Sequence, residues 1–338
     1  VFFSSIVVRL HGDEFAVVTK FPLEEIKRRI DLCIYKIKLT VEAGLLPDIF
    51  KFNVGVADCE EDIKLTREKA DFMMYFAKKD NNYIQEYNEK LWSSKLNHDK
   101  FLADILDDIK NDTFTYFQRH IHNVKNSKSV ISEIATRDSY GKSILTKDNY
   151  KELRDNAHLR KLDIYNLDYL LTKITNLLNG MVLINLDYKS LVSKKDLIEY
   201  LSTMIDVNMI NPNNVILSIN INDICMDVCD DVLDMFKKLK KIGFKLCIDK
   251  YSSKTIDYLF ENIDIDYVKV STEYWKESEK NEKTFKLLSS KIKVLNESSN
   301  TKFIFGCIEN IDEFKYIKDK FAKTLGDDIL VSGNYFSD

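Results

Sequence analysis

A strand-then-helix rhythm occupies the last two thirds of this 338-residue chain and restricts the folds that it can adopt. Strands that alternate with helices assemble into sheets that the helices cover from outside. Eight such units over about 225 residues predict an α/β fold of the TIM-like (βα)8 barrel type. The predicted strands lie near residues 113–122, 130–136, 181–186, 214–220, 244–249, 265–270, 302–307 and 328–332.

The polar residues that end these strands are the first candidates for a functional site. In a TIM-like barrel, the chemistry collects at the carboxyl ends of the strands. Glu, Asn, Asp and Lys side chains gathered there are the usual material of a magnesium and phosphate site. The candidates, one for each strand in chain order, are Gln118, Glu133, Asn185, Ser218, Asp249, Lys269, Gly306 and Ser332.

A smaller α/β region precedes the barrel. Its hydrophobic periodicity predicts two short strands around a turn at His11-Gly12-Asp13-Glu14, followed by a helix, a strand and a second helix. These elements lie at 5–20, 23–39, 50–58 and 61–79. We therefore expect a partial domain over residues 1–90, a helical connector over 91–112 and the barrel domain over 113–338.

Composition and charge exclude several classes of protein. With 45% hydrophobic and 31% charged residues, the chain can bury a substantial core and is not disordered. Its 50 Lys and Arg residues against 54 Asp and Glu residues give a net charge of -4, which argues against a nucleic acid polymer as partner. Six cysteines without zinc-ligand spacing favour a reducing, cytoplasmic location.

Membrane and targeting signals are not found in the sequence. No apolar run approaches the roughly 18 to 20 residues of a membrane span, and no signal-peptide pattern opens the chain. The first residue is Val1 rather than Met, so we expect a fragment. A sensor or membrane-bound region would then precede it in the longer protein.

Several short motifs resemble those of tandem GGDEF–EAL proteins, the bacterial machinery of the second messenger cyclic di-GMP. Residues 9–15, Arg-Leu-His-Gly-Asp-Glu-Phe, resemble the RxGGDEF signature. Residues 132–137, Ser-Glu-Ile-Ala-Thr-Arg, stand where EAL domains carry Glu-Ala-Leu-Leu-Arg. Residues 248–251 stand at the Asp-Asp-Phe-Gly loop, and residues 266–271 at the Lys-x-Asp strand. The order and spacing of these motifs cover nearly the whole chain.

The resemblance implies a catalytic site of which only half remains. An active EAL phosphodiesterase holds two divalent cations that activate a water molecule. At the family's catalytic positions this chain retains Glu133, Asn185, Asp249 and Lys269, the last being the family's general-base candidate. The metal site is disrupted at Ser218, Lys250 and Gly306, or Phe305 in a shifted alignment, and Ser332 replaces a glutamine. We therefore predict no cofactor; Mg²⁺ or Mn²⁺ would be needed only for residual phosphodiesterase activity.

The electrostatic consequence of these replacements is large. The family's acids are reduced to two and a lysine is added, a change of about four charge units toward positive. An ammonium group near Mg²⁺ is repelled by several kcal/mol at an effective dielectric of about 20. We expect Lys250 to replace a cation by pairing with Glu133 or Asp249. Alternatively, Glu133, Asp249 and Lys269 form a buried structural ion-pair network.

The GGDEF-like half is degraded as well. His11 occupies the position of a glycine at which the family's backbone approaches GTP. The family's inhibitory Arg-x-x-Asp would fall at Phe2 and Ser5. We therefore expect no cyclase activity.

Binding of cyclic di-GMP requires less than its hydrolysis, because arginines and backbone donors can hold phosphates without metal. By resemblance, the ligand-binding residues are Gln118, Glu133, Arg137, Asn185, Asp249, Lys269 and Glu309. The favoured hypothesis is a catalytically inactive EAL-type receptor or signalling scaffold. Its partners would be cyclic di-GMP, another protein, or a second copy joined through the altered loop at residues 252–254. The alternatives are a weak metal-dependent phosphodiesterase producing pGpG, and a protein-interaction module without nucleotide binding.

Overall fold

The computed structural model describes residues 1–338 except 48–51, 81, 147–148, 151–152, 155–157, 175–179, 193–195, 222–225, 253–257 and 337–338, and the side chains of 11, 174, 226–229 and 324. It divides into two compact units, Val1–Phe101 and Leu102–Asp338. None of the described helices has the length and apolar composition needed to cross a membrane.

Among its described residues, the N-terminal unit contains two small sheets, two complete helices and the first part of a third. Strands β1 (Ile6–His11) and β2 (Glu14–Val18) form an antiparallel hairpin, and β3 (Val54–Val56) pairs in parallel with β4 (Ile84–Glu86). The helices are α1 (Leu23–Glu42), α2 (Ile63–Lys79) and α3 (Glu89–Asn111), and the boundary between the two units falls within α3. The elements predicted for residues 5–79 are present, although residues 50–51 of the predicted strand at 50–58 lie outside the described residues. Helix α3 runs through the segment predicted as a connector.

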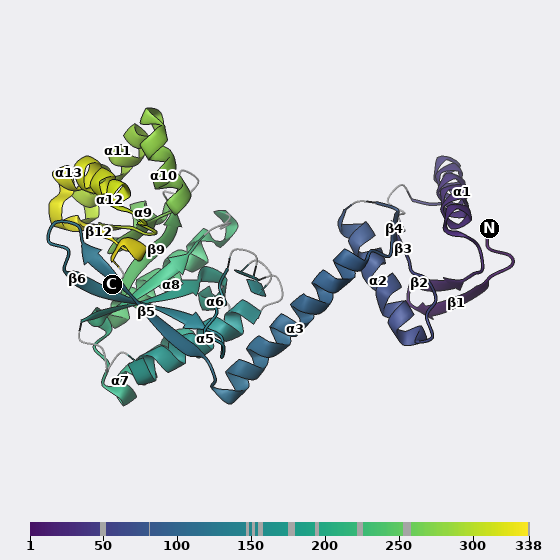
Figure 1. Cartoon of the computed structure of the whole chain (residues 1–338), viewed down its shortest axis with the longest axis horizontal. Helices are drawn as coiled ribbons and strands as arrows, with labels where there is room; N and C mark the ends of the chain where they lie inside the picture. The colour runs from purple at the N-terminus through teal and green to yellow at the C-terminus, as the bar shows by residue number, and fades with distance from the viewer. Residues whose placement is uncertain are drawn as a thin grey trace. The chain divides into compact units, whose positions relative to one another are not determined.

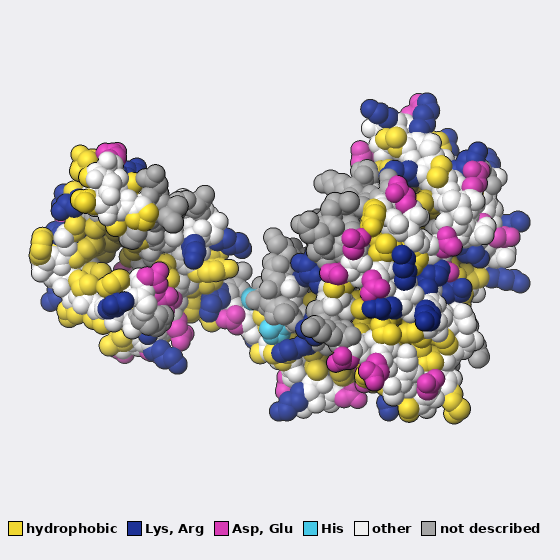
Figure 2. Space-filling view, turned by 180° about the vertical axis from the view of Figure 1, so that it is seen from behind, with side chains coloured by type: hydrophobic (Ala, Val, Ile, Leu, Met, Phe, Trp, Pro, Cys, Tyr) yellow, Lys and Arg dark blue, Asp and Glu magenta, His cyan; other side chains and the backbone are white. Residues whose placement is uncertain are grey.

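Side-chain hydrogen bonds stabilise the start of α2 and the turn of the β1–β2 hairpin. The carboxylate of Asp62 accepts hydrogen bonds from the backbone N–H groups of Lys64 and Leu65 and so caps α2. Arg9 donates two hydrogen bonds to the carbonyl oxygen of Gly12 across the hairpin turn. Hydrophobic side chains remain exposed on this unit (Figure 2), including Ile6 and Phe15 of the hairpin. The predicted obstruction by the His11 side chain lies outside the described residues, and the GGDEF resemblance stays a prediction.

The second unit is a closed barrel of eight strands, as the sequence predicts (Figure 1). Its strands, in order around the barrel, begin with an antiparallel pair and continue in parallel. They are β5 (Thr115–Asn123), β6 (Ser129–Arg137), β7 (Met181–Asp187), β8 (Val215–Asn220), β9 (Lys245–Tyr251), β10 (Tyr267–Val270), β11 (Lys302–Phe305) and β12 (Ile329–Val331).

The direction of β5 departs from the expected (βα)8 repeat. This strand runs antiparallel to both of its neighbours, β6 and β12. Only residues 124–128 connect β5 to β6, whereas a parallel connection requires a crossover of a dozen or more residues. The short connection therefore reverses the first strand, and its carboxyl end lies at the opposite end of the barrel from the others.

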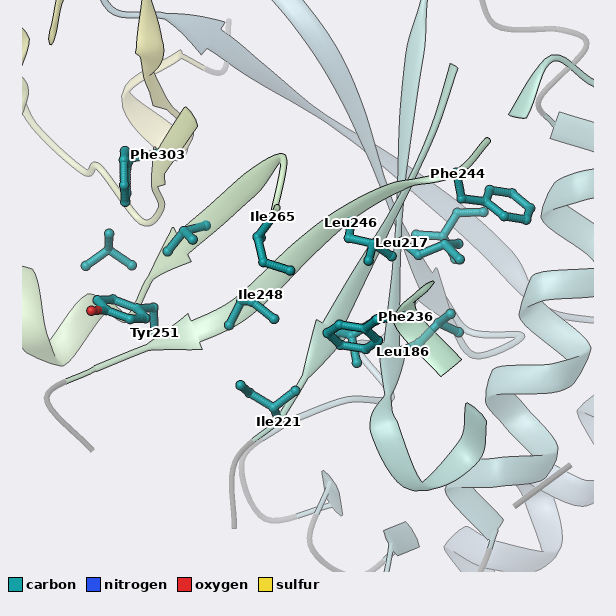
Figure 3. Close-up of a cluster of buried hydrophobic side chains, with 14 of the residues drawn as sticks. Leu186, Leu217, Ile221, Phe236, Phe244, Leu246, Ile248, Tyr251, Ile265 and Phe303 are labelled. Atoms are coloured by element: carbon teal, nitrogen blue, oxygen red, sulfur yellow. The ribbon is translucent and has the colours of Figure 1, made fainter. Parts of the chain in front are cut away.

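Helices pack on the outside of the barrel strands. They are α5 (His158–Tyr169), α6 (Tyr188–Val192), α7 (Leu197–Asn208), α8 (Met226–Ile242), α9 (Tyr258–Asn262), α10 (Thr272–Lys280), α11 (Glu282–Ser299), α12 (Ile311–Ile317) and α13 (Lys323–Leu325). Short π or 3₁₀ segments occur at Leu170–Ile174, Pro212–Asn214, Lys318–Ala322, Gly326–Asp328 and Asn334–Phe336. The core between strands and helices includes Leu186, Leu217, Phe236 and Leu246 (Figure 3).

A second, smaller core fills the inside of the barrel. Every strand contributes one buried residue to it: Ile121, Ile131, Leu183, Ile216, Cys247, Tyr267, Ile304 and Leu330. Because successive side chains of a strand point to opposite faces, the next inward position lies two residues further along. The polar residues at the carboxyl ends of the parallel strands therefore lie next to this inner core.

Gly333 allows the loops after β11 and β12 to approach each other. It adopts a φ of +153°, and a Cβ atom there would lie 2.2 Å from the carbonyl oxygen of Ile308. Two backbone hydrogen bonds of 3.0 Å, from Ile308 N to Ser332 O and from Tyr335 N to Ile308 O, hold this contact.

We expect Gly333→Ala to destabilise the barrel by about 2 to 4 kcal/mol, through both steric overlap and backbone strain. Gly180 is the matched control, because its φ is +117° but no atom of the described residues lies within 4 Å of the position that a Cβ atom would take there. Gly180→Ala carries the backbone strain alone and should cost less. Urea unfolding followed by circular dichroism measures both variants; equal losses of stability would contradict the role of the close contact.

Candidate functional site

Three of the four retained candidates converge on the ammonium group of the fourth, Lys269. Its Nζ lies 2.7 Å from Glu133 Oε1, 3.3 Å from Asn185 Oδ1 and 3.5 Å from Asp249 Oδ1. Asn185 Nδ2 also donates to Glu133 Oε1 at 2.9 Å. Strands β6, β7, β9 and β10 thus bring together residues that lie far apart in the sequence. We call this group the Lys269 network.

Burial makes the charges of this network depend on each other. The side chains of Glu133 and Lys269 are 5% and 17% exposed. Burial alone raises the pKa of a carboxyl group, but the Lys269 charge and hydrogen bonds from Lys269 and Asn185 lower the pKa of Glu133 to about 2. Burial likewise opposes the charge of Lys269, yet Asp249 and Glu133 raise its pKa above the usual value. Both groups are therefore charged at neutral pH.

The remaining strand ends beside the network carry no charge. Ser218 on β8 is fully buried, and Ser332 after β12 is 2% exposed. Gly306 follows β11, and a Cβ atom there would lie 3.7 Å from Ser332 Oγ. The alternative alignment at Phe305 does not reach the site, because Phe305 packs in the outer core at 4.9 Å from the ring of Phe321.

Among the described residues, the Lys269 network contains two carboxylates, those of Glu133 and Asp249, and Lys269 pairs with both. Arg119 adds a second positive charge, with Nη1 3.7 Å from Glu133 Oε2. Within the described part of the chain, no group of three His, Cys, Asp or Glu side chains is arranged to hold a metal ion. A formally neutral cluster does not offset the charge of two such ions.

Arg119, which the sequence reasoning missed, takes the place on β5 for which we predicted Gln118. The antiparallel register pairs Arg119 with Glu133, whereas Gln118 pairs with Ile134. Gln118 Nε2 donates to Ser132 Oγ at 2.8 Å, on the opposite face of the sheet from Glu133. The signal for Arg119 was its spacing of two residues from the apolar Ile121.

The predicted phosphate contact Arg137 lies beyond the network toward the open end of the barrel. Its guanidinium carbon is 5.4 Å from the ring centroid of Phe117, whose side chain is 48% exposed. Arg137 is at the end of β6, two inward positions beyond Glu133. A planar cation stacked on an accessible ring can contact both a phosphate and a base.

Lys250 does not make the contact that we expected. Its Nζ lies 4.6 Å from the ring centroid of Tyr150, and the cation that pairs with Glu133 and Asp249 is Lys269. Of the loop for which we predicted dimerisation, residues 253–254 lie outside the described residues.

A second polar cluster, also missed from the sequence, surrounds Tyr150. The Tyr150 hydroxyl donates to Asp187 Oδ2, and Asn220 Nδ2 donates to the Tyr150 oxygen at 2.5 Å. Arg154 Nε lies 3.4 Å from Asp187 Oδ2. Asp187 and Asn220 each follow a predicted site residue by two positions, so strand alternation could have identified them. Tyr150 and Arg154 lie in an aperiodic segment that gave no signal.

Glu309 lies outside the Lys269 network. It is exposed after β11, and its backbone N–H donates to Glu313 Oε2 at 2.8 Å. Glu313 in turn pairs with Lys276 Nζ at 2.8 Å. The structure therefore brings together Glu133, Asn185, Asp249 and Lys269, and places Gln118 and Glu309 away from them.

Two solved structures with a similar barrel are distant from this chain in sequence. The FimX EAL domain from Pseudomonas aeruginosa, solved bound to c-di-GMP, matches with a TM-score of 0.59 and 11% identity over 70% of this chain and 95% of that chain. The PaMucR phosphodiesterase in its c-di-GMP complex matches with a TM-score of 0.59 and 14% identity over 71% of this chain and 96% of that chain. These similarities establish the fold.

Sequence comparison adds the family. The cyclic di-GMP phosphodiesterase PdeA of Borreliella burgdorferi is 26% identical in an alignment of 321 residues that covers 86% of this chain. The chain spans only 45% of the length of that relative. The sequence model of the EAL domain matches residues 103–337, more than half of the chain and all eight barrel strands. The chain therefore belongs to the EAL domain family, the domain of cyclic di-GMP signalling.

Proposed function

We propose that the barrel is a receptor that binds cyclic di-GMP and does not hydrolyse it. The observation that carries the proposal is the small number of carboxylates in the Lys269 network, where Glu133 and Asp249 are present and both pair with Lys269. Lys269 is itself the family's general-base candidate, so the missing carboxylates, and not this lysine, argue against a site for two metal ions. The flanking positions Ser218 and Gly306 supply no further carboxylate.

Accessible cations at the barrel mouth support binding of the intact ligand. Arg137 stacks on the half-exposed ring of Phe117, and the Arg119 side chain is 42% exposed. Arginine holds phosphate by charge-assisted hydrogen bonds, while an accessible aromatic ring offers a stacking surface for a guanine. The EAL structures with this fold include c-di-GMP complexes, which supports the choice of ligand.

The phosphodiesterase PdeA favours a second candidate, residual hydrolysis of cyclic di-GMP to pGpG. The two functions differ in one measurable product. With the wild-type chain we expect no pGpG by chromatography after hours at high protein concentration, with Mg²⁺ or Mn²⁺ present, because the site lacks the carboxylates to hold two metal ions. Accumulation of pGpG in proportion to the amount of protein would contradict the receptor proposal.

Ligand binding is tested by calorimetric titration of cyclic di-GMP in EDTA. We expect binding without metal and a loss of about tenfold or more in affinity for Arg137→Ala, since a charge-assisted hydrogen bond to phosphate is removed. Arg160→Ala is the control, because Arg160 is exposed on α5 outside the barrel. Absence of binding with and without Mg²⁺ would exclude the receptor and leave a protein-interaction module.

If the Lys269 network stabilises the fold, the free energy of unfolding should depend on pH through Glu133. The carboxyl group of Glu133 has a pKa lowered from 4.5 to about 2 in the folded state. A group with a depressed pKa stabilises the fold above its unfolded pKa, and this contribution is lost as the pH falls toward 2. We expect the wild-type free energy of unfolding to decrease between about pH 5 and pH 2 more steeply than that of Glu133→Gln. Parallel pH profiles in urea unfolding would mean that folding does not lower the pKa of Glu133.

A further inference from the structure

Lys250 occupies an irregular position between β9 and β10. The two strands pair Ile248 with Val268 and Tyr251 with Val270. Two residues of β9, Asp249 and Lys250, therefore lie opposite the single residue Lys269 of β10, which is a β-bulge. The extra residue lets Asp249 face the Lys269 network while the buried Tyr251 still points to the outer core.

The backbone of this bulge is unfavourable for lysine. Lys250 has a φ of +55°, in the left-handed region. Glycine adopts this conformation readily, whereas a residue with a Cβ atom adopts it at an energetic cost. Strain of this kind persists where the surroundings enforce it and is concentrated at ligand sites. A glycine would satisfy the bulge with less strain, so the local backbone does not explain why this side chain is a lysine.

The charge of Lys250 is free to meet a ligand. Lys250 is exposed and belongs to no ion pair among the residues that the structure describes. The nearby carboxylates are engaged elsewhere: Asp249 faces Lys269, and Asp187 pairs with Arg154 and accepts from Tyr150. Tyr150, itself held by Asp187 and Asn220, supports the ammonium group through its ring.

We infer that Lys250 binds a phosphate group of the ligand at the barrel mouth. The inference rests on the proposed receptor function and adds a second phosphate contact to Arg137. Arg137 ends β6 and Lys250 lies near the end of β9, three strands away around the barrel. Cyclic di-GMP carries two phosphodiester groups, so one cation would contact each of them without a metal ion.

The charge is tested by titrating cyclic di-GMP into wild type, Lys250→Met and Lys250→Arg in EDTA. We expect about tenfold weaker binding for Lys250→Met and recovery to within about threefold in Lys250→Arg, because arginine restores the charge. The Kd of Lys250→Met should also depend less on salt than that of wild type. Lys238→Met on α8, where Lys238 pairs with Asp234 outside the barrel, is the control and should match wild type.

The backbone is tested separately with Lys250→Gly. This change relieves the strained φ while removing the charge, so we expect the melting temperature to stay within about 2 °C of wild type, or to rise, while affinity falls as in Lys250→Met. A residue that only stabilised the barrel through Tyr150 would show the opposite result, with a lower melting temperature and unchanged affinity.

The outcomes separate this inference from the function on which it rests. If wild type binds and Lys250→Met binds equally well, the phosphate contact is wrong and the receptor proposal stands. If wild type does not bind cyclic di-GMP at all, the receptor proposal fails and the role of Lys250 fails with it. Weaker binding by Lys250→Met that Lys250→Arg does not restore would also overturn the inference, because the charge would not be the cause.

Discussion

Closure of the eight-strand barrel fixes which side chains meet at its centre. Each strand contributes one residue to the core inside the barrel. On the parallel strands the side chain two positions later points to the same interior, and on the reversed strand β5 the side chain two positions earlier, Arg119, does so. Charged groups placed there lose most of their hydration and must be paired. The contact of Lys269 with Glu133 and Asp249 satisfies that requirement. It also leaves little net negative charge at this end of the barrel.

The pairing has a chemical consequence for the site. A carboxylate that already accepts from an ammonium group has less capacity to bind a divalent cation, and Arg119 places a second positive charge beside Glu133. Binding of an anionic ligand is favoured instead, because Arg137 and Lys250 contact aromatic rings and are not paired with carboxylates among the described residues. A cation on a ring keeps its hydrogen-bond donors available to a phosphate.

Hydrophobic period predicted the eight strands and the closed barrel, and motif order placed Glu133, Asn185, Asp249 and Lys269 at one end of it. Strand direction was not predicted, because alternation has a period of two whichever way a strand runs. The five-residue connection at 124–128 was the available signal for the reversal of β5, which moves Arg119 rather than Gln118 into the site. The contact of Lys250 with Tyr150 was unpredictable for another reason, since a bulge leaves no periodic trace.

Lys269 and Lys250, on the neighbouring strands β10 and β9, thus differ in burial and in ion pairing. Lys269 is buried and held by two carboxylates, so removing its partners would leave an uncompensated charge inside the barrel. Lys250 is exposed, unpaired within the described residues and held in a strained backbone. Only the second can exchange its present contact for a phosphate at small cost, because its ammonium group is still largely hydrated by solvent and rests on a ring. The bulge formed by Asp249 and Lys250 lets Asp249 pair with Lys269 while the next residue, Lys250, stays outside this network.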